Sequence, residues 1–196
     1  MKKLFVSGIF SIVILLAACK KDGPASATSV DGTYDFKYMS IKSNSSIVGS
    51  AGDKTVTTSD YSTINNGGTV IFNNGTLTAQ AVTYSVDTKS MLYLYDGDDL
   101  ITSSSYPFSY TIPANNPTGQ YKIVGADSIY FPQGGLTGNI DGTGSYQTIA
   151  SGGHFSFSGN LLTIIQNFTK DSTFHGSGET YHIIETATAS LILEKK

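Results

Sequence analysis

The chain has 196 residues, a length that suits one domain with a substantial hydrophobic core. Its 12 basic and 15 acidic residues give a formal net charge of −3, and all the basic residues are lysines. A mildly acidic protein without arginine is poorly suited to nucleic acid, because arginine supplies the bidentate contacts to phosphate and guanine. Twelve tyrosines, ten phenylalanines and 21 glycines, without tryptophan, are typical of a β-rich protein with many tight turns.

Residues 1–18 have the pattern of a signal peptide. Lys2 and Lys3 are followed by a mostly apolar run from Leu4 to Leu16. This run is too short to cross a hydrocarbon core of about 30 Å, which requires about 20 helical residues. The basic start, the short apolar run and the small residues at its end predict a secretory signal rather than a membrane-spanning anchor.

Leu16-Ala17-Ala18-Cys19 closes this segment and resembles the lipobox of bacterial lipoproteins, a leucine and two small residues before a cysteine. The resemblance implies that the Cys19 sulfur receives a diacylglycerol, that cleavage occurs before Cys19, and that palmitate-type chains anchor the protein in a membrane. The alternative is an ordinary signal peptide with a chance cysteine at its cleavage site. Lys20-Lys21-Asp22 lacks the aspartate next to the cysteine that retains such lipoproteins in the inner membrane. We therefore expect the protein to be anchored in the outer membrane, on either its periplasmic or its outer face.

Residues 19–30 are predicted to be the lipidated cysteine and a flexible tether, since they are small, polar and unpatterned around Gly23-Pro24. Removal of the two signal lysines leaves ten lysines against fifteen acidic residues, a net charge of about −5. Cys19 is the only cysteine, so the domain of residues 31–196 has no thiol for a disulfide and depends on its core.

Residues 31–196 alternate between apolar and polar side chains with a period of two, and no stretch shows a helical period. Tyr34, Phe36 and Tyr38 are predicted to share one face of the first strand. Asn73-Asn74-Gly75 is a strong hairpin signal, because both central residues of a type I′ turn need positive φ. Further strands are expected around residues 82–86, 91–95, 108–112, 121–124, 129–131, 155–157, 161–168 and 183–193. About ten antiparallel strands with short connections predict an all-β meander that closes into a barrel, with a β-sandwich as the alternative.

Gly32-Thr33-Tyr34, the meander of hairpins and the final segment from Ala189 to Lys195 resemble the lipocalin-like lipoproteins of Gram-negative bacteria. The resemblance implies a barrel of about eight to ten strands, with Tyr34 in the position of the family's tryptophan at the closed end. It also implies a cup that holds a small apolar or amphipathic ligand. The aromatic residues that we expect to line this cup are Tyr34, Tyr38, Tyr84, Tyr93, Tyr95, Tyr121 and Phe155. The alternative is that these rings fill a solid core.

Two groups of residues have side chains that can bind a metal ion. His154, His175 and His182 could bind zinc if the strands brought them together, but two of them lie opposite the apolar stripes and are expected at the surface. Asp96-Gly97-Asp98-Asp99 is acidic enough for calcium, yet it lacks the spacing of a calcium loop and a nearby glutamate. A solvated hairpin turn is the better prediction there. We therefore expect no metal and no cofactor.

Catalytic motifs are missing from the sequence: there is no Gly-x-Ser-x-Gly elbow, no cysteine nucleophile in the domain and no glycine-rich phosphate loop. The three glutamates all fall within the last 18 residues. Carboxylate pairs that converge in space stay open, since their separation is unreadable from sequence. Asp127-Ser128-Ile129 and Asp171-Ser172-Thr173 resemble the acceptor pattern for O-glycans on exported proteins of some Gram-negative bacteria. The chain is not predicted to be an enzyme.

These patterns predict a monomeric, non-catalytic module, anchored at the outer membrane through its lipid, that binds a small apolar or amphipathic ligand in a barrel. The alternative is a structural or adhesive surface protein with a solid core, acting through its loops and an aromatic patch around Tyr106-Pro107-Phe108 and Phe131-Pro132. A hydrolase would require two carboxylates, or a histidine and a carboxylate, that converge in a cleft.

Overall fold

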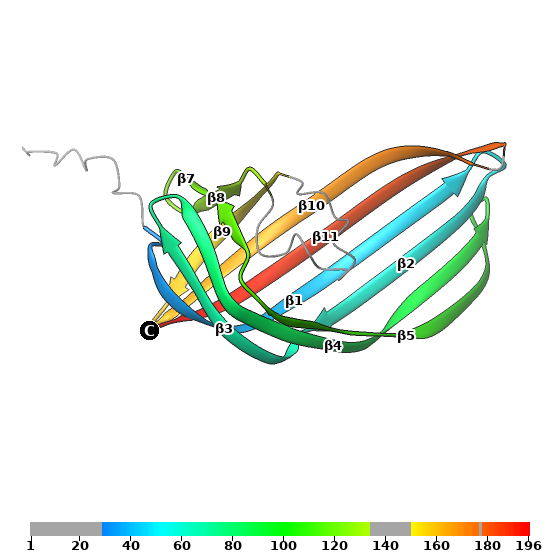
Figure 1. The fold of residues 1–196 in the computed structure, drawn as a ribbon. Helices are drawn as coiled ribbons and strands as arrows, with labels where there is room; N and C mark the ends of the chain where they lie inside the picture. The colour runs from blue at the N-terminus through cyan, green and yellow to red at the C-terminus, as the bar shows by residue number, and fades with distance from the viewer. Residues whose placement is uncertain (1–28, 134–149, 177) are drawn as a thin grey trace, which may run out of the picture.

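The computed structural model describes residues 29–133, 150–176 and 178–196, and within them the protein is all-β, as predicted. The signal segment, Cys19 and the tether as far as residue 28 lie outside the described residues. Eleven strands form one antiparallel sheet (Figure 1). They are β1 (Gly32–Gly49), β2 (Asp53–Ser62), β3 (Ile64–Asn73), β4 (Thr76–Asp96), β5 (Asp99–Asn115), β6 (Thr118–Gln120), β7 (Lys122–Val124), β8 (Ser128–Phe131), β9 (Ser151–Ser158), β10 (Leu161–Gly176) and β11 (Glu179–Lys195).

Strands β2 and β3 act as two successive parts of one interrupted strand between β1 and β4. The first residues of β1, Gly32 to Asp35, pair with β3, and residues 40–48 of β1 pair with β2. Strand β4 likewise pairs first with β3 and then with β2. The sheet therefore contains a partial ring of four strands, β1, β2, β4 and β3, and this ring is not a barrel.

Thr63 joins the two parts of the interrupted strand to β1. Its backbone N–H donates to the Met39 carbonyl at 2.8 Å, and its side-chain Oγ1 accepts from the Met39 N–H at 2.9 Å. Gly68, with φ of +97°, lets the chain re-enter the ladder, because a Cβ there would lie 2.5 Å from the Ala81 carbonyl oxygen. The break is thus built by a buried hydroxyl at one end and a glycine at the other.

The meander continues on both sides of this ring. Strands β11, β10, β9, β8 and β7 follow β1 in hydrogen-bonded order, while β5 and β6 both pair with β4. Only Tyr121 separates β6 from β7 in the chain, and its N–H donates to the Gly75 carbonyl at 2.8 Å. The two sides of the sheet therefore approach each other at the end that carries the C-terminus, where the sheet curls most strongly (Figure 1).

The hydrophobic core lies at this curled end. Its largest fully buried apolar side chains are Tyr34, Phe72, Met39, Ile41, Ile129, Leu162, Ile164 and Leu193. On the concave face of the sheet, the last row of buried side chains that crosses several strands contains Ile41, Tyr61, Ala189 and Gln166. In the next row of described residues, Ser90 of β4 alone is buried. Gln166 itself donates to the Ser151 Oγ at 3.0 Å.

Beyond that row, six strands continue into what we call the distal sheet, made of residues 42–60, 91–107 and 167–187. None of its described residues is buried, so no second layer of described residues covers either face. The strands β5, β4, β2, β1, β11 and β10 run side by side here, and Figure 1 shows them extending away from the core end. Eight residues of β1 make this region about 26 Å long, at about 3.3 Å per residue.

Two predictions about the sheet need correction. Tyr38 does not share a face with Tyr34 and Phe36: the register with β11 shifts between Phe36 and Tyr38, so Tyr38 points away from the core and is 42% exposed. The described strands number eleven rather than eight to ten, and they form one hydrogen-bonded sheet rather than the two sheets of a sandwich. The Asn73-Asn74-Gly75 hairpin is confirmed, with φ of 47° at Asn74 and 82° at Gly75.

Candidate functional site

Aromatic side chains close the curled end of the sheet. Tyr34 is completely buried and its hydroxyl donates to the Val30 carbonyl at 2.8 Å. The Tyr34 and Phe72 rings meet edge-on at 5.9 Å between centroids, and Phe72 meets Tyr121 in the same way at 5.2 Å. The Tyr121 hydroxyl donates to Asp31, which lies at the surface. These rings contact one another and seal this end of the core.

The hydrogen bond between Tyr121 and Asp31 has an electrostatic consequence for both groups. Burial, followed by the nearby carboxylate, raises the pKa of Tyr121 to about 12. The Tyr121 hydroxyl is the largest cause that lowers the pKa of Asp31, because it stabilises the charged carboxylate. Asp31 also accepts a 3.2 Å hydrogen bond from the backbone N–H of Asn74. The Asp31 carboxylate thus links the start of β1 to the β3–β4 turn and to the connection between β6 and β7.

A second aromatic cluster lies at the margin of the core, where the distal sheet begins. Phe36, Tyr84, Tyr110, Phe108 and Tyr61 form a chain of ring contacts with centroid distances of 5.3 to 6.3 Å. Burial is the first cause that raises the pKa of Tyr84 to about 12, and it also raises the pKa of Tyr110. Four of these residues, Phe36, Tyr61, Phe108 and Tyr110, were not among the predicted lining residues.

The structure divides the seven predicted lining residues between two faces. Four have buried side chains on the core side: Tyr34, Tyr84, Tyr121 and Phe155. Tyr34 and Tyr121 share the cluster at the closed end, whereas Tyr84 belongs to the cluster at the core margin. Tyr38, Tyr93 and Tyr95 lie on the opposite face, as their strand registers show. The structure therefore does not bring these seven residues together.

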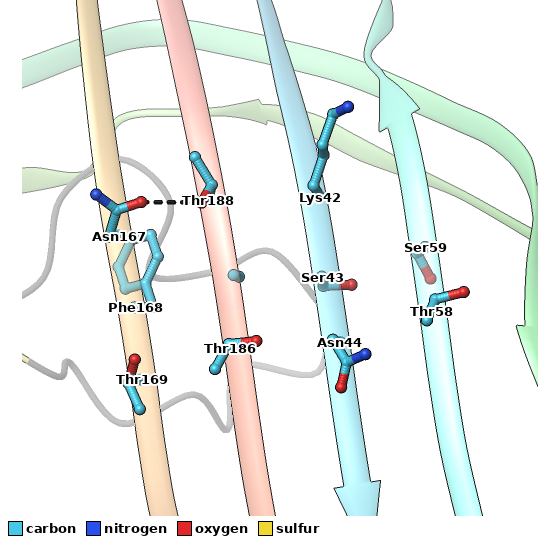
Figure 2. A pocket seen from close by; sticks show the side chains of 11 residues that line it. Lys42, Ser43, Asn44, Thr58, Ser59, Asn167, Phe168, Thr169, Thr186 and Thr188 are labelled. Atoms are coloured by element: carbon cyan, nitrogen blue, oxygen red, sulfur yellow. Dashed lines mark hydrogen bonds between the residues drawn. The ribbon is translucent and has the colours of Figure 1, made fainter.

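An open, polar groove of about 490 Å³ crosses four strands of the distal sheet, β2, β1, β11 and β10 (Figure 2). Seven of its lining side chains share the face opposite to the core: Lys42, Asn44, Thr58, Asn167, Thr169, Thr186 and Thr188. Ser43, Ser59, Phe168 and Ala187 also border this space, but they alternate with the seven, so their side chains point to the core face of the sheet. Hydroxyl and amide groups, which can each donate and accept hydrogen bonds, dominate the groove.

The charge in this groove is compensated locally. Lys42 is the only ionisable residue of the lining, and its Nζ lies 3.1 Å from Oδ2 of Asp60 on β2. One rim is organised by a hydrogen bond of 2.8 Å from the Thr188 Oγ1 to the Asn167 Oδ1. Figure 2 shows this bond between β10 and β11. The groove is therefore polar and close to neutral.

Tyr93 and Tyr95 extend the same face onto β4, next to the groove. Thr58 of the groove pairs with Met91, and the following pairs toward the tip are Val56 with Tyr93 and Lys54 with Tyr95. The Lys54 ammonium lies 4.5 Å from the centre of the Tyr95 ring, a cation–π contact. Two half-exposed phenol rings thus stand within about two strand spacings of the groove floor.

Thr186 and Thr188 alternate with the apolar side chains of the last predicted strand, and they lie on the face of β11 opposite to the core. The sequence could not show the groove itself, because β1 and β2 meet β11 and β10 only through the β1–β11 pairing, which joins residues more than 100 positions apart. An outward run of threonines and asparagines was the only local signal.

The histidines lie at the surface, as expected. His154 Nδ1 is 3.4 Å from the Ser128 Oγ and 3.8 Å from the Asp127 carboxylate, with both partners on the same ring nitrogen. A catalytic serine triad instead holds its serine and aspartate on opposite nitrogens. His182 Nε2 lies 2.7 Å from the Asp171 carboxylate and is also exposed. Within the described ranges no three histidine, cysteine, aspartate or glutamate side chains form a metal-binding group.

Other predicted features are placed as follows. Asp96 to Asp99 forms the exposed turn between β4 and β5, as predicted, with positive φ at Gly97. The expected aromatic patch is only partly present: Tyr106 is 40% exposed, whereas Phe131 is 2% exposed and belongs to the core. Two of the glutamates, Glu185 and Glu194, form ion pairs with lysines on neighbouring strands.

The described fold and groove define an all-β protein with a core at one end and a solvent-exposed sheet at the other. In comparisons with known proteins, the chain matches no family model, no curated protein and no solved structure. No helix in the described ranges is long and apolar enough to cross a membrane.

Proposed function

We propose that this protein is a lipid-anchored, non-catalytic binding module of the bacterial cell envelope, and that the distal groove binds a neutral, polyhydroxylated ligand such as a segment of glycan. The observation that carries the proposal is the groove itself, where eight of the eleven lining residues carry a hydroxyl or an amide group. This function combines the predicted binding module with the adhesive surface protein that was its alternative.

The chemistry of the groove favours a neutral ligand over an anion. Asp60 offsets the positive charge of Lys42 at 3.1 Å, so no uncompensated cation faces the groove. Threonine, serine and asparagine side chains both donate and accept, which matches the mixed hydrogen bonding of sugar hydroxyls. Each such bond contributes about 0.5–1.5 kcal/mol net, so an open groove binds through several weak contacts along an extended ligand.

Tyr93 and Tyr95 support the same choice of ligand. Their rings lie on the groove face of β4 and are only half buried, so their apolar area is available to a ligand that leaves the groove over β2. Flat rings with a polar hydroxyl suit molecules that have both apolar C–H faces and hydroxyl groups. This arrangement gives Tyr93 and Tyr95 a binding role on the outside of the sheet rather than inside a barrel.

The anchor rests on the sequence of the lipobox at Cys19. Two or three acyl chains hold a protein on a membrane persistently, whereas one chain gives marginal binding. Val30, at the end of the predicted tether, is completely buried in the core, so the tether ends before it. A flexible tether of the ten residues 19–28 would span roughly 17 Å on average, which sets the domain close to the outer membrane. Metabolic labelling with an alkyne analogue of palmitate should label the wild-type chain and leave Cys19→Ser unlabelled. Equal labelling of both proteins would contradict the lipid anchor.

A lipocalin-like site for an amphipathic ligand is the second candidate. The observation that favours it is the cluster of Tyr61, Tyr84 and Tyr110 at the open margin of the core, where Phe108 and Tyr110 are only partly buried. An acyl chain could contact these rings while its polar end meets the tyrosine hydroxyls. Laurate or palmitate should then raise the melting temperature of the full chain in micelles of an uncharged detergent, and Tyr110→Phe should reduce that rise.

Affinity gel electrophoresis of the detergent-solubilised full chain tests the groove. Soluble dextran, mannan and xylan are cast separately into native gels, and binding to one of them should retard the wild-type protein. Thr186→Arg fills the groove and should abolish the retardation, whereas Thr173→Arg, on the same face but outside the groove lining, should not. Absence of retardation in every gel, or equal retardation of both variants, would overturn the glycan proposal.

A further inference from the structure

The outer edge of β5 is unpaired along its distal part. Strand β5 pairs with β4 through residues 99–115, and no described residue hydrogen-bonds to its other side. Residues 99–107 are all exposed. The backbone N–H and C=O groups that point away from β4 therefore face solvent, which makes this edge a template for another strand.

The opposite edge of the distal sheet is protected, and the contrast is informative. Strand β9 covers β10 only as far as Asn167, so the rest of β10 is also an edge. That edge carries Lys170, Asp171 and His175, charged or ionisable side chains that discourage pairing with other strands. The β5 edge has no charged residue between Leu100 and Asn115, and its first proline is Pro107. Seven residues, Leu100 to Tyr106, thus form an edge without charge or proline, and one bulge at Ile101 is the single protective feature within it.

This edge also gathers exposed apolar side chains. Leu100 is 53% exposed, Ile101 is 65% exposed and Tyr106 is 40% exposed. Cross-strand partners on a neighbouring strand would cover such side chains, and aromatic and β-branched pairs stabilise a sheet by about 0.2–1 kcal/mol each. The edge therefore presents free hydrogen-bonding groups together with uncovered apolar surface.

We propose that the β5 edge, Leu100 to Tyr106, pairs antiparallel with the same edge of a second copy of this chain around a twofold axis, which joins two distal sheets into one. A second copy is favoured because an uncharged strand can face itself without like charges opposite each other. A twofold axis also makes any antiparallel strand self-complementary. The sequence carried no sign of this edge, so the chain was expected to be a monomer.

The size of the contact predicts where the dimer forms. Seven paired residues make an edge about 23 Å long. A single pair of strands of this length buries less surface than the roughly 800 Å² per partner of a standard interface. Dimerisation is therefore weak between freely diffusing copies and is strengthened when copies are concentrated on one membrane. This last step rests on the proposed lipid anchor, whereas the pairing itself is independent of the groove, which lies on other strands.

Two differently tagged copies of the full chain, co-expressed and reconstituted together into phosphatidylethanolamine–phosphatidylglycerol vesicles, test the proposal by chemical crosslinking and recovery through one tag. Ser104 lies near the middle of the edge and is exposed. Wild-type copies should crosslink. Ser104→Lys copies and Ser104→Asp copies should each lose at least tenfold in crosslinked product, while a mixture of the two variants should regain it.

The matched control is Thr173→Lys on the exposed β10 edge, which should crosslink as the wild type does. Recovery in the lysine–aspartate mixture excludes misfolding as the cause of the loss, since a misfolded chain would not be rescued by a second variant. No crosslinking between wild-type copies, unchanged crosslinking of Ser104→Lys, or failure of the mixture to recover would overturn the pairing. None of these results depends on glycan binding, so the two proposals fail separately.

Discussion

Removal of the Thr63 hydroxyl should destabilise the protein, because it leaves a buried backbone N–H without a hydrogen-bond acceptor. Thr63 is 4% exposed and stands where β2 breaks from β3, and its Oγ1 accepts the Met39 N–H at 2.9 Å. Thr63→Val keeps the shape but leaves the Met39 N–H without this acceptor in a buried position. Such an orphaned group costs about 1–3 kcal/mol. For a domain of this size, each kcal/mol lowers the melting temperature by about 2–4 °C, so a fall of roughly 2–12 °C is expected.

The assays are thermal and urea denaturation, each followed by tyrosine fluorescence and circular dichroism, since the chain has no tryptophan. Thr63→Ser keeps the hydroxyl and loses one methyl group, so it serves as the matched control and should cost about 1 kcal/mol or less. Thr63→Val should lower the midpoint without a change in the slope of the transition. A Thr63→Val protein within 0.5 kcal/mol of wild type, or a more damaging Thr63→Ser, would refute the role assigned to this hydroxyl.

Three further predictions concern the core and its closed end. Tyr34→Ala should destabilise the domain by about 3–5 kcal/mol, because it empties a fully buried site, while Tyr93→Ala should stay within about 0.5 kcal/mol of wild type in the same denaturation experiment. Because the pKa of Asp31 is lower in the folded protein, its ionised carboxylate stabilises the fold at a pH above the ordinary carboxyl pKa. This stabilisation is lost as the pH falls through the folded-state pKa. The stability difference between wild type and Tyr121→Phe should therefore shrink from pH 7 to pH 3, and a constant difference would contradict the linkage. Gly68→Ala should lower the free energy of unfolding by more than about 1 kcal/mol, since the positive φ and the close backbone contact of Gly68 exclude a Cβ. An unchanged urea midpoint would contradict this, because it would mean that the backbone at the strand break shifts to accommodate the Cβ.

The sequence predicted the fold class because alternation of apolar and polar residues reports directly on strands with one buried face. The hairpin at Asn73-Asn74-Gly75 was predictable for a local reason, since positive φ at two adjacent positions suits few residue types. Tyr38 was misplaced because one register shift after Phe36 turns the following side chains to the opposite face. Nothing local in the sequence marks that shift.

The candidate site was less predictable than the fold. The sequence analysis divided this region into separate strands at residues 82–86 and 91–95, whereas β4 runs without a break from Thr76 to Asp96. Tyr93 and Tyr95 therefore lie on the face opposite to Tyr84, by simple alternation along one strand. Where a core ends along a strand depends on what covers the strand in space, and alternation by itself does not report this. The polar groove and the free β5 edge depend on which strands are neighbours, and that information is carried by long-range pairing.

Hydrogen–deuterium exchange of the full chain, with and without the polysaccharide that retards it in native gels, tests the binding surface most directly. The account predicts that bound polysaccharide slows exchange in peptides from residues 42–44 of β1 and 186–188 of β11, which line the groove. The core strand β8 should already be slow and should not change. Protection confined to the core margin around Tyr84 and Tyr110, with no change at the groove, would contradict the account and favour an interior ligand site.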